Sequence, residues 1–127
     1  MADPVQVQDS ILDTTKKMLG FDWDYTAFDL DIMTHINSVF FTLQQLGVGQ
    51  PNFSIEDNTK TWAEFEAGDN IAAVKSYMYL KVRIIFDPPA NSFTQEAMNK
   101  QATEYEWRLN AYTEGVRWRE SQIPTTS

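Results

Sequence analysis

The stretch KVRIIFDPP, residues 81–89, decides the fold class of this 127-residue chain. Taken alone, its β-branched and aromatic residues would suit a buried strand that the double proline ends. Apolar residues upstream, however, recur at steps of 3, 4, 4 and 3, the spacing of one helical face: Ile71, Val74, Met78, Val82 and Ile85. A strand would have to begin in the middle of this pattern. The spacing therefore predicts one helix from Asp69 or Asn70 to about Phe86, with its end at Asp87 because proline disfavours helical backbone in the residue before it.

Capping residues and glycines predict the ends of the other helices. The apolar spacing between residues 29 and 47, with steps of 4, 3, 1, 3 and 3, marks the clearest helix of the chain. The first of these helices is expected to begin at Asp9 or Ser10 and to end at Gly20, and the second to begin at Asp29 and to end at Gly47. A short helix should begin at Thr61, with Glu64 completing its cap, and end at Gly68. The last should begin at Ser92, with Gln95 completing its cap, and end at Gly115. In the last helix, the residues expected to face inward are Met98, Ala102, Tyr105, Leu109 and Tyr112.

The segments between these helices are expected to be loops. The sequence FDWDYTAFD, residues 21–29, alternates aromatic and acidic residues, which favours a loop pinned by its rings. After Gly115, the sequence VRWRESQIPTTS has no helical period and is predicted to be an extended arm. The chain is therefore expected to be all-α: a small bundle of four principal helices plus one short helix in a domain of residues 1–115, followed by a C-terminal arm of residues 116–127.

The composition limits the classes of function. Eighteen acidic and ten basic residues give a net charge of -8, so a basic face that grips the phosphate backbone of DNA is not expected. The absence of cysteine excludes disulfides, thiolate chemistry and Cys-ligated zinc. The N-terminal sequence MADPVQVQDS is acidic and polar where a signal peptide would be basic and then apolar, and no apolar run approaches the roughly 18 residues of a membrane span. We expect a soluble protein without a membrane partner.

No motif predicts catalysis, a cofactor or a metal. The close acidic pairs at residues 22 and 24, 29 and 31, and 104 and 106 are poor sites, because residues two apart on a helix face different ways. Asp22 and Asp24 could hold a hard cation in their loop, but the spacing of a calcium-binding helix-loop-helix is absent. His35 has no Ser, Cys or second His in a recognisable motif and is expected to pack half-buried. An enzyme is therefore not expected.

Five segments resemble, in order, the head-tail connector (adaptor) proteins of tailed bacteriophages and prophages. They are DSILDTTKKMLG, HINSVFFTLQQLGVG, the TW of residues 61–62, VKSYMYLKVRIIFDPP and YEWRLN. The resemblance covers about residues 9–110 and rests on the number and order of the segments. It implies a structural role in the virion neck, at the head-tail interface, after synthesis in the host bacterial cytoplasm. Copies would form a ring, commonly of twelve, between the portal protein and a stopper or tail-completion protein, and DNA would pass through the ring without specific binding.

Exposed aromatic and arginine residues are the candidates for the ring and portal contacts, since such residues are enriched where proteins meet. The candidate interface residues are Trp23, Tyr25, Arg117, Trp118 and Arg119, of which Trp118 is the strongest because it lies in the segment without helical period. Tyr79 is a further aromatic candidate. Trp62 and Trp107, in contrast, are expected to pack in the core or to anchor a loop.

A second hypothesis comes from another class of function. An acidic module can bind a basic host protein by imitating the charge of DNA, and the net charge of -8 suits such a decoy or regulator. A ring on portal particles would favour the connector, whereas a one-to-one complex with a basic partner would favour the decoy.

Overall fold

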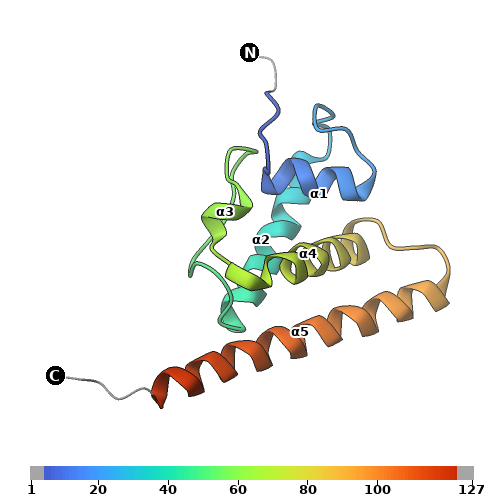
Figure 1. The fold of residues 1–127 in the computed structure, drawn as a ribbon. Coiled ribbons are helices and arrows are strands. Elements are labelled where there is room, and N and C mark those ends of the chain that lie inside the picture. Colours follow the sequence, from blue (N-terminus) through green and yellow to red (C-terminus); the bar gives the residue numbers. More distant parts are fainter. Residues whose placement is uncertain (1–4, 123–127) are drawn as a thin grey trace.

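The computed structural model describes residues 5–122 of the chain, and its secondary structure is helical throughout (Figure 1). The elements are α1 (Ile11–Leu19), α2 (Asp29–Gln45), α3 (Trp62–Phe65), a 3₁₀ turn η1 (Gly68–Asn70), α4 (Ile71–Phe86) and α5 (Ser92–Ser121). Within residues 5–122 no strand forms, and the only β-type pairing is an isolated bridge between Ser10 and Thr61. The all-α prediction of four principal helices plus a short one is confirmed.

Helix α4, which ends with the stretch 81–86, is the central element. It buries four side chains completely, namely Val74, Tyr77, Met78 and Val82. Tyr77 donates a hydrogen bond to Glu106 of α5, whereas the ring of Phe86 lies 6.3 Å from that of His35 on α2. Residues nine positions apart project from opposite sides of a helix, so α4 lies between α5 and α2. The prediction that Ile85 faces inward is wrong: this side chain is 52% exposed.

The helix ends test the predicted capping residues. Ser10 caps α1 by accepting a hydrogen bond from the backbone N–H of Asp13 at 3.1 Å, and Gly20 ends α1 in the left-handed conformation, as predicted. At α3, the Glu64 side chain accepts from the backbone N–H of Thr61 at 2.8 Å, which confirms the predicted start of this helix. The predicted stop at Gly68 is two residues late, because Glu66 already adopts the left-handed conformation that ends α3.

Two predicted caps are wrong. Asp29 is the first residue of α2, and the cap position belongs to Phe28. The Phe28 side chain has no oxygen that could accept a hydrogen bond from a backbone N–H. The carboxylate of Asp29 is instead held by a lysine of α1. At the start of α5, Asn91 takes the position predicted for Ser92, since its side-chain oxygen accepts from the backbone N–H groups of Phe93 and Thr94.

Helix α5 continues through Gly115 to Ser121, so the prediction of an extended arm is wrong for residues 116–121. A glycine inside a helix costs only about 1 kcal/mol relative to alanine, which is too little to end a helix whose neighbours on both sides favour it. The backbone of α5 is therefore a continuous helix across the expected boundary between residues 115 and 116. The division of roles between residues 1–115 and 116–127 stays a prediction. Residues 123–127 lie outside the described part of the chain.

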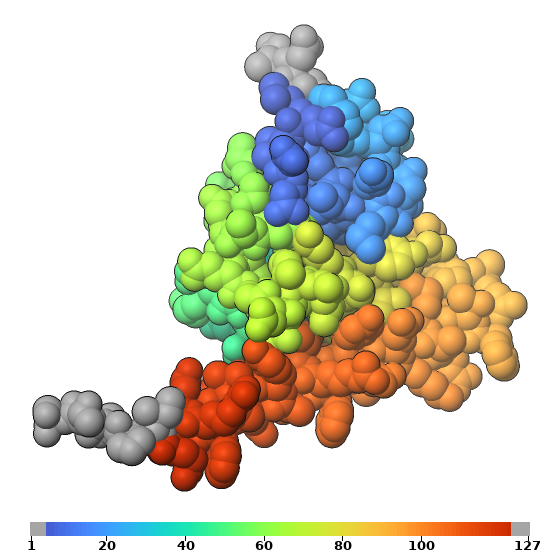
Figure 2. Space-filling model, in the orientation of Figure 1, coloured from blue at the N-terminus to red at the C-terminus, as the bar shows by residue number. Residues whose placement is uncertain are grey.

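Helix α5 runs along one edge of the molecule (Figure 1). It is held mainly by α4, and its C-terminal turns extend past the body formed by the other helices. Figure 2 shows the outer side of α5 as a ridge that no other element covers in this view. A helix of 30 residues supported along one side leaves much of its surface available for contact.

Candidate interaction surfaces

Contacts between aromatic side chains hold the loop between α1 and α2 in place, as its sequence predicts. Phe21 stacks on Tyr25 with ring centroids 5.7 Å apart, and Phe28 lies 5.8 Å from Phe21. Phe86, at the end of α4, contacts both Phe21 and Phe28 at 6.0 and 5.6 Å. Tyr25 remains 48% exposed at the outside of this cluster. The loop is thus a firm surface on which a candidate interface side chain stands.

A buried ion pair fixes the same loop to the helices on either side. Lys16 of α1 is only 1% exposed, and its ammonium group lies 2.8 Å from a carboxylate oxygen of Asp29. It also donates to the backbone carbonyl of Trp23 at 2.8 Å, so half-buried Trp23 is positioned through its backbone. Sequence reasoning missed this pair, because the adjacent KK of residues 16–17 gives no sign of which lysine turns inward.

Three large aromatic side chains project from α5. Phe93 is 82% exposed, Trp107 is 71% exposed and Trp118 is 64% exposed. The intervals of 14 and 11 residues are close to whole numbers of helical turns, so the three rings lie along one outward face. The expectation that Trp107 packs in the core is wrong, because Ala102 and Leu109 fill the inward face of α5. Trp62, in contrast, is buried as expected, and its indole N–H donates to Thr14.

The structure does not bring the five candidate interface residues together. The loop between α1 and α2, which contains Trp23 and Tyr25, lies at the upper right of Figure 1, whereas the last turns of α5 lie at the lower left. Arg117, Trp118 and Arg119 are all exposed, and the Arg117 side chain extends over Gly47 at the end of α2. The candidates therefore define two separate surfaces, one on the loop and one at the end of α5.

The remaining residues considered in the sequence are Tyr79, as a contact residue, and the acidic and histidine side chains, as possible sites of chemistry. Tyr79 is half-buried, and its hydroxyl accepts from Arg83 within α4 at 3.2 Å. Burial and a hydrogen bond to Glu106 raise the pKa of the neighbouring core residue Tyr77 far above its ordinary value. Asp22 and Asp24 are exposed in the loop, and His35 is half-buried, as predicted. Among residues 5–122, no group of three or more acidic or histidine side chains is arranged to hold a metal ion.

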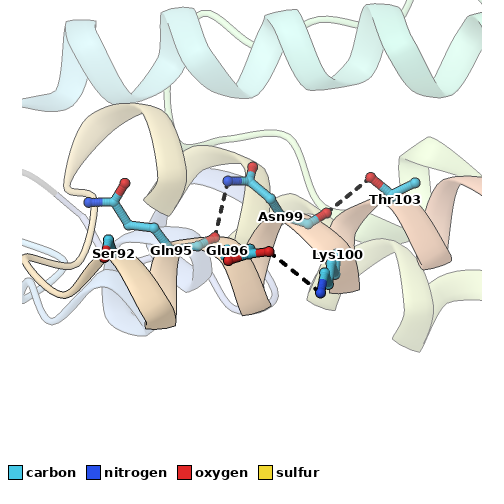
Figure 3. A pocket seen from close by; sticks show the side chains of 6 residues that line it. All are labelled: Ser92, Gln95, Glu96, Asn99, Lys100 and Thr103. Atoms are coloured by element: carbon cyan, nitrogen blue, oxygen red, sulfur yellow. Dashed lines mark hydrogen bonds and ion pairs between the residues drawn. The ribbon is translucent and has the colours of Figure 1, made fainter.

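The hollows of the surface are open, and the one with the most polar set of lining residues is drawn in Figure 3. The one in Figure 3 is formed by six residues of α5 alone: Ser92, Gln95, Glu96, Asn99, Lys100 and Thr103. The polar contacts drawn there stay within the helix, for example the ion pair between Glu96 and Lys100 at 3.6 Å. A single helix cannot surround a substrate, because its side chains diverge from one another. In the part of the chain that is described, no helix is long and apolar enough for a membrane crossing.

These features describe an all-helical protein with exposed aromatic side chains on the α1–α2 loop and on α5. The family model described as phage connector protein matches residues 11–116, and the chain belongs to this family. The match spans all the principal helices and stops five residues before the end of α5. No curated protein and no solved structure matches the chain.

Proposed function

We propose that the chain is a head-tail connector, or adaptor, of a tailed phage that forms a ring in the virion neck. The observation that carries the proposal is membership of the phage connector family over residues 11–116. Twelve copies would bind beneath the portal protein, extend the DNA channel and bind a stopper or tail-completion protein on the other side. The protein acts through contact alone, without catalysis, a cofactor or a metal.

The physical character of the chain supports this role. A ring needs heterologous contacts, in which one patch of each subunit binds a different patch of the next. Exposed aromatic residues on α5 and on the α1–α2 loop provide separated patches of the kind that such contacts use. The net charge of -8 suits a channel wall, because like charge keeps passing DNA from adhering.

The end of α5 is the proposed portal-binding segment. Arg117, Trp118 and Arg119 are exposed on turns that extend beyond the helical body. A tryptophan flanked by arginines has the composition of a strong interface residue, since aromatic and arginine side chains dominate binding energies. Trp23 and Tyr25 belong to a second proposed contact surface, on the other side of the molecule.

The test uses phage heads that contain DNA and the portal but lack this polypeptide. The purified chain is added, and the necks are imaged by electron microscopy with symmetry analysis. We expect a ring of density beneath the portal, with twelve copies. Heads that stay bare at the vertex would contradict the proposal. A one-to-one complex with a basic host protein, together with bare heads, would favour the DNA-mimic alternative.

A further inference from the structure

The inward side of α5 continues beyond the part of the helix that packs on α4. Thr113 and Val116 are half-buried and follow the buried residue Leu109 at steps of 4 and 3, so the three side chains lie on the same side of the helix. Figure 1 shows the turn that follows α2, residues 47–49, beside the C-terminal half of α5. This turn therefore supports the end of α5.

Gly47 makes the contact with α5 in this turn. A Cβ at Gly47 would lie 2.8 Å from the methyl carbon of Thr113 and 2.7 Å from Nη2 of Arg117, both closer than Cβ atoms come to other heavy atoms in proteins. Arg117 follows Thr113 by four residues and so lies on the same side of α5. The two side chains thus occupy the space that a side chain at position 47 would need, and we call this arrangement the Gly47 contact.

The methyl group of Thr113 is fixed in direction. The Thr113 hydroxyl donates a hydrogen bond to the backbone carbonyl of Leu109 at 3.0 Å. In a helix, threonine adopts two side-chain rotamers, and such a bond selects between them. A short side chain held in this way cannot swing aside, so a larger residue at position 47 would have to displace the backbone of α5. The position of this part of α5 therefore depends on Gly47.

Arg117 adds a favourable charge to the same contact. The last turn of α2 contains no basic residue, and the free carbonyl groups at the end of a helix carry partial negative charge that a cation stabilises. The Arg117 guanidinium, placed over Gly47, brings a positive charge to this end of α2. Glu114 and Glu120 lie about one turn from Arg117 on either side. Within residues 5–122, however, Arg117 forms no ion pair with them or with any other residue.

The surface beside the Gly47 contact is open. A hollow of about 350 Å³ has Tyr112 and Val116 of α5 among its lining residues, and Ala67 and Asn70 of the segment before α4. Side chains do not fill the space between the end of α5 and this segment. The direction of the last turns of α5 is therefore set by the contact at Gly47 more than by packing around it.

We infer that the Gly47 contact positions the portal-binding segment, with Thr113 and Arg117 as its positioning residues. Successive residues of a helix point about 100° apart, so Trp118 and Arg119 point away from the body when Arg117 faces Gly47. The inference rests on the proposed function, within which it divides the candidate residues. Arg117 holds the end of α5 in place, whereas Trp118 and Arg119 contact the portal.

The first test measures where the end of α5 lies and needs no phage particle. Because the chain has no cysteine, spin labels are attached to Ser38→Cys on α2 and Ser121→Cys at the end of α5, both at exposed positions. Double electron-electron resonance gives the distance between the labels. We expect Gly47→Ala to shift this distance. The control pair, Ser38→Cys with Lys100→Cys in the first half of α5, should report no shift.

A rescue variant separates the contact from the backbone cost of the substitution. Gly47 has a φ of +79°, which disfavours alanine in any variant. Adding Thr113→Ser to Gly47→Ala removes the methyl group and keeps the hydroxyl that bonds to Leu109. The distance between the labels should then return to that of the parent chain. An unchanged distance in Gly47→Ala, or a shift that Thr113→Ser does not reverse, would overturn the inference.

A second measurement leaves Gly47 unchanged and tests the division of roles between the arginines. Arg117→Gln should broaden the distribution of label distances, whereas Arg119→Gln should not change it. Binding to portal-bearing heads that lack the polypeptide should fall about tenfold in both variants, since arginines at interfaces contribute strongly to affinity and a misdirected segment binds poorly. If Arg117→Gln weakens binding without changing the distances, Arg117 contacts the portal directly and the division is wrong.

The remaining outcomes separate the Gly47 contact from the connector role. Distances that change as expected, with a parent chain that does not bind the heads, would support the contact and contradict portal docking. Normal binding of the heads by Gly47→Ala, despite a shifted α5, would refute the role of the contact in docking and leave the connector function standing.

Discussion

At the scale of single residues, Lys16 is the least expected feature of the core. Its ammonium group is almost completely enclosed and depends on the carboxylate of Asp29 and the carbonyl of Trp23. An enclosed charge is costly unless it is paired and hydrogen-bonded. The pair joins α1, the aromatic loop and α2, so its loss should loosen the loop that presents Tyr25.

The substitution Asp29→Ala should lower the free energy of unfolding by roughly 2–3 kcal/mol. This is less than the usual 3–5 kcal/mol for breaking a buried pair, because Asp29 is 22% exposed. Urea unfolding followed by circular dichroism measures the change. Asp31→Ala, an exposed neighbour in the same helical turn, is the control and should cost less than about 1 kcal/mol. Equal losses in the two variants would contradict a specific role for the pair.

Gly49 is held at a second demanding position. Its φ of +74° favours glycine, and the ring of Phe65 occupies the space that a Cβ would need. Gly49→Ala should therefore cost about 2–4 kcal/mol, from backbone strain and overpacking together. Gly20→Ala is the matched control, since Gly20 has a φ of +96° but open space around it, and should cost only about 1 kcal/mol. Similar unfolding midpoints for the two variants would show that the contact with Phe65 is unimportant.

At the scale of elements, the continuity of α5 changes how the C-terminal segment presents its side chains. A helix through Gly115 places Trp118 on the same side as Trp107, whereas an extended arm would leave it free to turn in any direction. A preformed surface binds with a smaller entropic cost than a segment that must become ordered. The candidate residues of the last turns are therefore pre-positioned by the helix.

Gly115→Ala should stabilise this helical end by about 0.5–1 kcal/mol, because alanine is a better helix former and its Cβ meets no atom within 4 Å. Amide hydrogen exchange should show increased protection of residues 116–121. In a segment that is not helical, the same substitution would leave the exchange of these amides unchanged, and that result would contradict the continuous α5.

At the scale of the whole molecule, the α5 helix is both part of the core and an outward surface. Its inward face is anchored by Ala102 and Leu109, and both are upstream of Gly115. The turns beyond Gly115 contribute mainly exposed residues. The parts that fold the chain and the parts proposed to dock it are therefore separable.

Deletion of residues 116–127 should leave a folded helical protein that no longer docks on portal-bearing heads. The helicity of the truncated chain is measured by circular dichroism, and docking is measured by co-sedimentation with heads. Trp118→Ser in the full-length chain is the companion variant, and it should reduce docking while retaining helicity. Normal docking by the truncated chain would refute the assignment of portal binding to this segment.

The local pattern of residues was sufficient for most of the helical elements. The helical reading of residues 81–86 holds, because the spacing of apolar residues reflects which side of a helix meets the core. Ser10, Thr61 and the glycines after α1 and α2 also occupy predicted positions, since capping depends on atoms only a few residues apart. The connector resemblance followed from the order of the same segments and agrees with the family match.

What the sequence alone determined, then, was the helical class, the main helices and the family. Only the tertiary structure decided that Lys16 is enclosed, that Trp107 is exposed and that α5 continues past Gly115. The physical reason is that periodicity and capping are local, whereas the burial of a side chain depends on which distant helix lies against it.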